Sequence, residues 1–462
     1  MPNTVNMAFV KPTGPSREER GYADIFGEAL TLTAGRDFRH LLHNREHETT
    51  TNITCQQPRS LATYSPDLPA SNITVYEQAP EYSEIGAGVG IGVSAGRVLQ
   101  KLGVWPAANA VSGHRNNVHR SNRRWDTDEL IVDALAFDNG GAEEVRQLWV
   151  HRAEFLEVLY SEIQRRNCAT LKTNKRLVGL EDNGSTVTLR FADGTEESAN
   201  LVIGCDGIHS TVRSHFAVDK PVYSGRIAFR GTIPLSAVSD DWPYSSWTLS
   251  WLAPNKHFLA FPMSQNRLMN VVAFVSKPES ELGGLKESWR SEAPREAIEK
   301  EYAGWNPTVQ RIIQAMPPII SEWKINDREI LSQWCYMDGK VVLSGDAAHA
   351  MLPMQGSGAG LSIEDANMLG FAVRDYLKSP GAGLATYMNL YQAARVPRAQ
   401  KAQITSRQAA EVYDMHGPDF EGKTFEECLP VVRDKVKDRM AWVWKSNLEA
   451  DWAAAKESIG LA

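Results

Sequence analysis

The sequence predicts an α/β fold with an inserted, mostly antiparallel β-sheet and a helical C-terminal region. Two short apolar strands that end in an acid, Ile73–Glu77 and Val341–Asp346, lie next to helical segments, as in open α/β sheets. From about residue 221 to 276 the pattern changes to short strands rich in Trp, Phe and Val. From residue 361 onward helical patterns dominate.

Composition narrows the class of protein. The 462 residues are 42% hydrophobic and 23% charged, which suits a globular chain of two or three domains. A net charge of -7 without a basic run argues against a nucleic-acid partner. There is no apolar stretch of membrane-spanning length and no apolar leader, so we expect a cytoplasmic protein that does not bind a membrane. The five cysteines form no C-x-x-C pair, so we expect free thiols and no metal site.

The expected elements follow in chain order. Residues 1–70 are polar and contain no strand-like apolar run, so we expect an atypical segment that is a candidate for disorder. After the strand Ile73–Glu77 come a glycine-rich loop and the helix Ser94–Leu102. A helix at Trp149–Arg165 precedes the strand Leu201–Cys205. Four strands are expected in the inserted sheet, at Arg226–Arg230, Trp247–Leu252, His257–Phe261 and Met269–Val275.

These elements suggest a division into domains. Residues 71–217 and 330–384 are expected to form one discontinuous domain. Residues 218–329 would form the inserted sheet domain, and residues 385–462 the helical region, which begins with a long helix at Ala385–Val412.

The most informative motif is Gly345-Asp346-Ala347-Ala348-His349, which follows a buried strand and leads to Gly356, Gly358 and Gly360. A carboxylate at the end of such a strand can accept a hydrogen bond from a ligand hydroxyl. Glycines let the backbone approach a flat ring, and the following helix N-terminus can stabilise an anion such as a reduced flavin. A glycine-rich turn with an ordinary helix cap explains this motif equally well.

Two further strands end in an acid. Leu201–Cys205 leads into Asp206-Gly207, and Ile73–Tyr76 leads into Glu77. In dinucleotide-binding folds an acid at the position of Glu77 holds the adenosine ribose. Taken alone, each is explained as readily by a strand–turn joint or a solvated strand end.

In combination and order, the motifs of residues 71–400 resemble the group A flavoprotein monooxygenases, the salicylate hydroxylase and p-hydroxybenzoate hydroxylase family, in its fungal type. The matching blocks are Val75–Pro80, Glu84–Gly88, His151–Glu154, Cys205–Gly207 and Gly345–Ala366. The resemblance implies a Rossmann-like FAD-binding domain with an inserted substrate sheet.

The resemblance also implies roles for particular residues. The residues expected to bind FAD are Glu77 at the adenosine ribose, Gly90 in a loop near the cofactor, Arg152, Asp206, Asp346 at the ribityl chain, and Ala359 beside the isoalloxazine ring. Arg230, in Phe229-Arg230-Gly231, matches an arginine near the flavin that anchors or activates a phenolic substrate.

The implied activity is hydroxylation of a small phenol or an aromatic polyketide with NAD(P)H and O2, through a flavin C4a-hydroperoxide. An arginine suits this chemistry because it stabilises a phenolate. The expected partners are therefore a small aromatic substrate and O2. An epoxidase or dehydrogenase of the same fold is a second hypothesis.

The sequence departs from the family in two places. Members begin with a strand, a G-x-G-x-x-G turn and a helix, and residues 1–72 contain no such glycine triplet. The similar run Gly90-Ile91-Gly92-Val93-Ser94-Ala95 has no strand leading directly into it and follows Glu77, so we interpret it as the later cofactor loop. The missing unit makes a flavin-free pseudoenzyme a third hypothesis.

The second departure is Phe261, which stands where fungal relatives have a tyrosine that acts with the arginine. Tyr223 and Tyr244 are the candidates to replace its hydroxyl.

Overall fold

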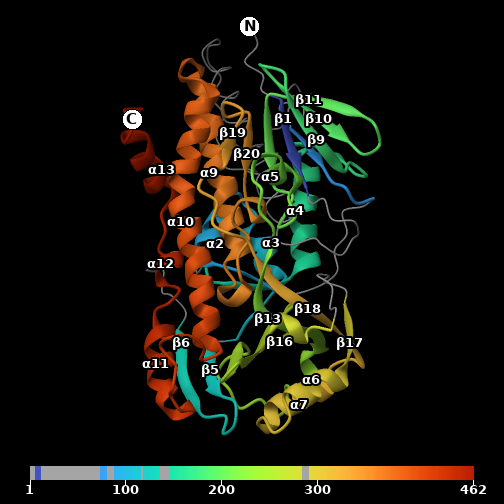
Figure 1. The fold of residues 1–462 in the computed structure, drawn as a ribbon, viewed down its shortest axis with the longest axis vertical. Helices are drawn as coiled ribbons and strands as arrows, with labels where there is room; N and C mark the ends of the chain where they lie inside the picture. The colour runs from blue at the N-terminus through green and yellow to red at the C-terminus, as the bar shows by residue number, and fades with distance from the viewer. Residues whose placement is uncertain are drawn as a thin grey trace, which may run out of the picture.

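The structure is a computed structural model that describes residues 6–11, 73–80, 88–115, 118–135, 145–283 and 291–461. A parallel sheet lies at one end of the molecule and an antiparallel sheet at the other, and two long helices run between them (Figure 1). Cys55 and the segment around residues 37–47 lie outside the described residues. This arrangement confirms the predicted fold class.

The parallel sheet has six strands. Their order is β19 (Cys335–Tyr336), β20 (Val341–Leu343), β12 (Leu201–Gly204), β1 (Met7–Val10), β2 (Ile73–Tyr76) and β8 (Thr170–Lys172). All pairs are parallel except the edge pair β19–β20. Because parallel strands end at the same edge of a sheet, the residues that follow β20, β12, β1 and β2 lie along one line.

Strand β1 corrects the expectation that no strand precedes Ile73. Met7, Ala8, Phe9 and Val10 are at most 3% exposed and pair with β2 on one side and β12 on the other. The strand is only four residues long, and both of its faces are buried, so it has no alternating pattern to reveal it.

The antiparallel sheet has eight strands along its main path. Their order is β17 (Glu292–Pro294), β18 (Ile319–Asp327), β13 (Val222–Pro234), β16 (Leu268–Ser276), β15 (Lys256–Met263), β14 (Leu249–Ala253), β5 (Val118–Arg124) and β6 (Leu130–Leu135). The four predicted strands correspond to β13, β14, β15 and β16. Strands β5 and β6 lie within the segment 71–217, so this part of the chain contributes to both sheets.

Three smaller strands of the described residues, β3 (Gly88–Ile91), β4 (Ser112–Gly113) and β7 (Leu148–His151), adjoin the antiparallel sheet, and two of them change details of the sequence interpretation. Strand β3 leads directly into the run that begins at Gly90, contrary to expectation, but it pairs antiparallel with β7 and is not in the parallel sheet. Helix α4 (Arg152–Arg166) therefore begins three residues later than the predicted Trp149. A separate hairpin sheet contains β9 (Leu177–Asp182), β10 (Val187–Phe191) and β11 (Glu196–Ala199).

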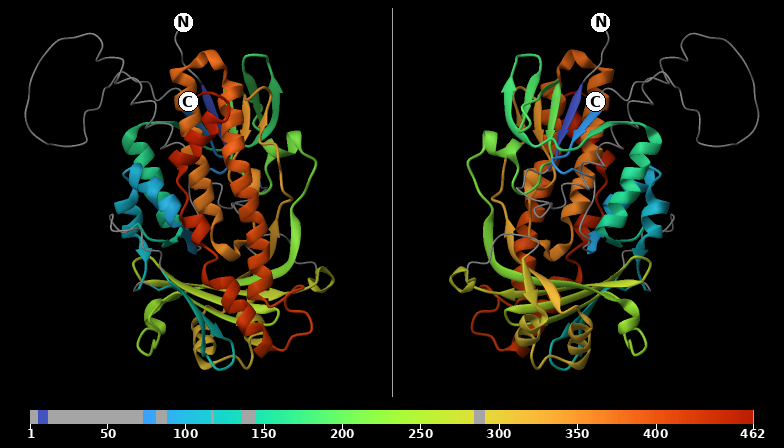
Figure 2. Two further views of the ribbon diagram at one scale, coloured as in Figure 1. Left: turned by 90° about the vertical axis from the view of Figure 1, so that its left-hand side faces the viewer. Right: turned by 90° about the vertical axis from the view of Figure 1, so that its right-hand side faces the viewer.

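The helices connect the two ends of the molecule. Helix α9 (Gly358–Lys378) packs against α10 (Leu384–Tyr413) and against α2 (Val93–Lys101). Helix α10 runs from the parallel sheet to the antiparallel one, as the two side views show (Figure 2). Helices α11 (Phe425–Lys437), α12 (Ala441–Trp444) and α13 (Leu448–Glu457) confirm the helical C-terminus. In the described part of the chain, the structure contains no helix with the length and apolarity of a membrane span.

The burial of β1 predicts a large effect of truncation at its centre. Phe9→Ala should lower the free energy of unfolding by about 3–5 kcal/mol, because it leaves a cavity in the middle of the sheet. Urea denaturation measures this change, with Val218→Ala at a fully exposed position as the control. A Phe9→Ala protein as stable as the control would show that β1 does not occupy the centre of the sheet.

Candidate active site

Charged residues gather at the carboxyl edge of the parallel sheet. Asp346 follows β20, Asp206 follows β12, Lys11 follows β1 and Glu77 follows β2. The exposed fraction of each residue is 7% or less, so a series of buried charges crosses the edge of the sheet. Ligands of open α/β sheets bind at this edge, and buried charges require partners there.

Glu77 and Asp206 both accept hydrogen bonds from the backbone that follows their strands. Oε1 of Glu77 accepts a hydrogen bond of 2.7 Å from the backbone of Ala79. Both oxygens of Asp206 are occupied at the start of α5 (Thr211–Phe216), where they accept from the Ser210 hydroxyl and from the backbones of Thr211 and Val212. Burial raises the pKa of Asp206 to about 6, although these donors oppose the shift. Asp206 thus caps α5.

The turn that presents Asp346 depends on Asp365 in α9. Asp365 accepts hydrogen bonds from the Gly345 backbone at 3.0 Å, from the Ser344 hydroxyl at 3.2 Å and from Nε2 of His349 at 2.6 Å. Gly345 has φ of 57° and ψ of -143°, which favours glycine over residues with a side chain. Asp365 therefore determines the path of the chain on both sides of Asp346.

Arginines from α10 balance the buried acids of α9. Nε of Arg395 contacts Asp365 at 2.7 Å, and its Nη1 contacts Glu364 at 3.0 Å. Arg398 and the Ser94 hydroxyl also donate to Glu364. Burial acts to raise the pKa of Asp365, but His349 and Arg395 outweigh it and lower the pKa to about 2.

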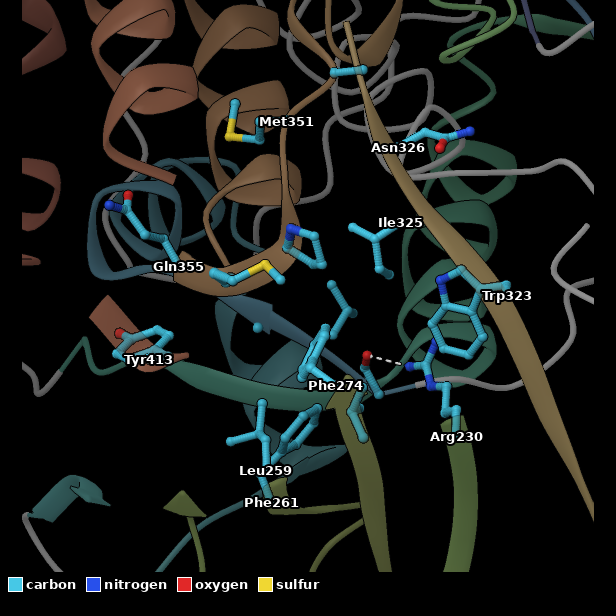
Figure 3. A pocket seen from close by; sticks show the side chains of 18 of the residues that line it. Arg230, Leu259, Phe261, Phe274, Trp323, Ile325, Asn326, Met351, Gln355 and Tyr413 are labelled. Carbon is cyan, nitrogen blue, oxygen red and sulfur yellow. Dashed lines mark hydrogen bonds between the residues drawn. The ribbon is translucent and has the colours of Figure 1, made fainter. Parts of the chain in front are cut away.

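A cavity lies between the two sheets, with a volume of about 160 Å³. A cavity of roughly 150 Å³ can hold a benzene ring, so this one suits a small aromatic molecule. Its walls come from β3, β5, β13, β15, β16, β18, the loop before α9, and the ends of α10 and α11. Leu259, Phe274, Ile325 and Tyr413 point into it, as the close view shows (Figure 3).

Arg230 is held at one side of this cavity. Its Nη2 donates to the Gly88 carbonyl at 2.7 Å and its Nε to Oδ1 of Asn270 at 3.1 Å. The guanidinium lies 5.6 Å from the ring centroid of Trp323. Two hydrogen bonds and an aromatic contact therefore orient the positive charge before a substrate arrives.

The residues singled out from the sequence fall into two groups. Gly90, Arg230 and Asp346 line the cavity, which brings together β3, β13 and the first residue of α8 (Asp346–His349). Outside the cavity lining lie Glu77 and Asp206 at the sheet edge, Arg152 at the start of α4, and Ala359 in the buried first turn of α9. Their roles in binding FAD stay predictions.

The glycines of the α9 loop serve different purposes. Gly356 has φ of +59° and lines the cavity, and no atom lies within 4 Å of the place where its Cβ would stand. A Cβ on Gly360 would lie 3.4 Å from the backbone nitrogen of Gly92, so Gly360 permits α9 to pack closely on α2. Gly356 therefore leaves open space at the cavity, and Gly360 lies in contact with the start of α2; the approach of a ring to this loop stays a prediction.

Phe261 packs against another aromatic side chain at the cavity. Its ring centroid lies 4.5 Å from that of Trp149, and both rings line the cavity. Tyr223 donates to the Lys277 carbonyl, and Tyr244 donates to Asp128. Neither tyrosine is among the described residues that line the cavity, so the structure supports neither as a replacement hydroxyl.

Several cavity residues were not found from the sequence. They are Arg120 on β5, Trp149 on β7, Trp323 on β18, Tyr413 at the end of α10 and Arg439 after α11. No motif marks them, because each lies in an otherwise ordinary strand or helix end. One available signal was the arginine-rich strand Val118–Arg124, which is unusual for a strand with a neighbour on both sides.

The described residues fit an FAD molecule at this place. Helix α9 begins beside the cavity, and the side chain of its N-cap residue, Ser357, does not cap it. The first N–H groups of a buried helix need an acceptor, and the carbonyl edge of a flavin ring supplies one. Glu77 suits a ribose hydroxyl and Asp346 a ribityl hydroxyl. The described residues contain no cluster that could hold a metal ion.

Sheet order, edge acids and the cavity between the domains define a flavoprotein with a separate substrate sheet. The family described as FAD binding domain matches residues 73–406. Salicylate hydroxylase of Pseudomonas putida is 32% identical over 84% of this chain and 90% of its own. The 6-methylsalicylate 1-monooxygenase of Aspergillus terreus is 30% identical over 82% and 84%. A salicylate hydroxylase substrate complex has the same fold, with a TM-score of 0.74 over 98% of both chains at 24% identity.

The chain belongs to this FAD-binding family, that of the FAD-dependent aromatic monooxygenases. Its cofactor is FAD.

Asp365 gives a test of the constraint on the Asp346 turn. Asp365→Asn should lower the free energy of unfolding at pH 7 by at least about 2 kcal/mol, because the ionised carboxylate is favoured in the folded state. Since its folded pKa lies below the unfolded value, this difference is fully present above roughly pH 4 and is lost as the pH falls toward 2. Denaturation at several pH values measures it, with the exposed Asp434→Asn as the control. A difference that grows on acidification would contradict this assignment.

Proposed function

We propose that this protein hydroxylates a small phenol or a related aromatic molecule with NAD(P)H and O2. The observation that carries the proposal is the cavity that has Arg230 on one wall and Asp346 with Gly356 on another. The relatives support it, since they include two enzymes that act on salicylate and 6-methylsalicylate by name. An aromatic polyketide is the second candidate substrate.

The side chains of this protein prepare the reaction in distinct ways. Bound FAD supplies the electrons from NAD(P)H and the activation of O2. Arg230 stabilises the phenolate form of the substrate, which makes the ring carbon more nucleophilic. The apolar wall of Leu259, Phe274 and Ile325 excludes water from the place where the substrate would bind. Asp346 would hold the ribityl chain of bound FAD.

The site expected to bind the pyrophosphate of FAD departs from the family pattern. Residues 1–72 lack a G-x-G-x-x-G run, yet β1 occupies the central place in the sheet, and the buried Lys11 follows it. A lysine at the edge between Glu77 and Asp206 can neutralise a pyrophosphate charge where glycines would otherwise let the backbone approach. We infer that FAD binds with a modified cradle.

The purified protein also tests the two other hypotheses, a flavin-free pseudoenzyme and an epoxidase or dehydrogenase of the same fold. A purified protein that is colourless and does not bind added FAD would exclude catalysis and favour the flavin-free pseudoenzyme. If FAD binds, phenol-stimulated NAD(P)H oxidation under ¹⁸O₂ distinguishes the reactions. An unlabelled product would point to a dehydrogenase, and a labelled epoxide to an epoxidase.

Arg230 provides the sharpest single variant. Arg230→Lys should lower kcat/KM for a phenol roughly ten- to hundredfold, because lysine cannot make both hydrogen bonds that orient the guanidinium. FAD affinity, measured by visible titration, should not change. Arg267→Lys, at a largely exposed position in the turn between β15 and β16, is the control. Full activity in Arg230→Lys would remove this residue from the proposed mechanism.

A further inference from the structure

The C-terminal end of α10 packs against the antiparallel sheet beside the cavity. The helix ends at Tyr413, which lines the cavity, and the next residue, Asp414, is its C-cap. Met415 then takes the left-handed conformation, with φ of 46°, so the helix does not continue. Asp414 is fully buried. A buried carboxylate costs free energy unless charged and polar partners surround it.

Three strands of the sheet supply partners for Asp414. Its Oδ1 lies 2.6 Å from Nδ1 of His257 on β15, and its Oδ2 lies 2.5 Å from Nε of Arg226 on β13. The hydroxyl of Ser276 on β16 donates to Oδ2 at 3.4 Å. The backbone carbonyl of Asp414 also accepts from the backbone N–H of Asn255 at 2.7 Å. Asp414, His257 and Arg226 form what we call the docking group, which joins the end of α10 to β13 and β15.

The charges of the docking group balance without a proton added to His257. Burial acts to raise the pKa of Asp414, but His257 and Arg226 outweigh it and lower this pKa. Burial lowers the pKa of His257, although Asp414 opposes the shift. At pH 7 the imidazole is therefore neutral and donates through Nδ1 to the carboxylate. Arg226 supplies the counter-charge.

The docking group lies next to two side chains of the cavity wall. The ring of His257 stacks on that of Phe274, with 4.3 Å between the centroids and 16° between the planes. It lies 5.5 Å from the ring centroid of Tyr413. Phe274 and Tyr413 both point into the cavity, and Tyr413 lies on the other side from Arg230 (Figure 3). The place where α10 meets the sheet therefore sets the distance between this wall and Arg230.

The same helix is held at the parallel sheet by a second buried acid. Arg395 of α10 contacts Asp365, which accepts from the backbone of Gly345 in the turn that presents Asp346. The helix is continuous from there to the antiparallel sheet, as both side views show (Figure 2). A shift of the sheet at Asp414 would therefore move the cavity floor relative to the turn that presents Asp346.

We propose that Asp414, His257 and Arg226 are positioning residues of the reaction, which hold the antiparallel sheet and the substrate on it in place relative to the cofactor. This inference rests on the proposed hydroxylase function. Oxygen transfer to a ring carbon requires the ring to lie within a narrow range of distance and angle, and small displacements lower the rate strongly. A sheet that moves against α10 would still bind a phenol but would hold it less accurately.

Hydrogen exchange of the full-length, FAD-treated protein tests the docking contact without turnover. The reporter is the turn between β14 and β15, where the N–H of Asn255 donates to the carbonyl of Asp414. Asp414→Asn should accelerate exchange in this turn at least roughly tenfold, because it removes the charge that pairs with Arg226. Exchange in β12, at the other end of the molecule, should stay within about twofold. Equal acceleration in both segments would mean a general loss of stability and would overturn the proposal.

The coupling of NAD(P)H oxidation to product formation tests the positioning role. Two electrons from NAD(P)H either place one oxygen atom of O2 in the product and the other in water, or reduce O2 to hydrogen peroxide. The probe is whichever of phenol, 2-hydroxybenzoate and 4-hydroxybenzoate stimulates NAD(P)H oxidation most. In Asp414→Asn the ratio of product to NAD(P)H should fall at least roughly threefold, with hydrogen peroxide accounting for the difference. The ratio does not depend on how much of the protein is folded, so destabilisation alone leaves it unchanged.

Two variants of His257 separate the hydrogen bond from the ring. His257→Asn keeps an N–H group near the place of Nδ1 and removes the ring that stacks on Phe274, whereas His257→Phe keeps a ring and removes the N–H. His257→Asn should keep the coupling ratio within roughly twofold, and His257→Phe should lower it as Asp414→Asn does. The reverse order would assign the wall to ring packing and would overturn the proposal. Asp419→Asn removes an exposed acid that pairs with Lys435 and, as the charge control, should change neither exchange nor coupling.

These measurements distinguish the docking group from the proposed function. Unchanged coupling in both Asp414→Asn and His257→Phe would overturn the positioning role and leave the hydroxylase function in place. If no probe gives a hydroxylated product with the unsubstituted protein, the hydroxylase function is wrong and the positioning role falls with it. If Asp414→Asn does not fold, His257→Phe carries both measurements, because it leaves the pair of Asp414 and Arg226 intact.

Discussion

The arrangement of the site depends on one buried carboxylate. Asp365 joins the turn that presents Asp346 to the long helix α10 through Arg395, and the exposed fraction of both Asp365 and Arg395 is zero. A buried carboxylate is stable only with hydrogen-bond donors around it, and here His349, Ser344 and the Gly345 backbone supply three beside Arg395. Any movement of the turn would break these three hydrogen bonds to a buried charge.

Because α10 continues past the parallel sheet, the same helix sets the far wall of the cavity. Arg395 contacts Asp365, which holds the turn that presents Asp346. Tyr413, eighteen residues later, ends the helix against the antiparallel sheet. A helix rises about 1.5 Å per residue, so the two points are roughly 27 Å apart along one rigid element. The length of α10 therefore sets the distance between the turn that presents Asp346 and the Tyr413 end of the cavity.

The sequence predicted the elements whose patterns are local. Strand β2 with its terminal Glu77, the strand before Asp346 and the antiparallel strands with Arg230 were found where the structure has them. Strand β1 was missed because four apolar residues with both faces buried show no periodicity. The contact of Gly360 with Gly92, which belongs to a distant segment, was also not visible in the local pattern.

The sequence by itself determined the fold class, the family and the acids at the sheet edge, because each of these follows from residues close together in the chain. Only the tertiary structure decided which side chains line the cavity. Arg120, Gln355, Tyr413 and Arg439 come from four separate elements, and they meet because the antiparallel sheet packs against the ends of α10 and α11. The burial of these side chains is a property of the packed molecule that no local pattern contains, because the elements that bury them are far apart in the chain.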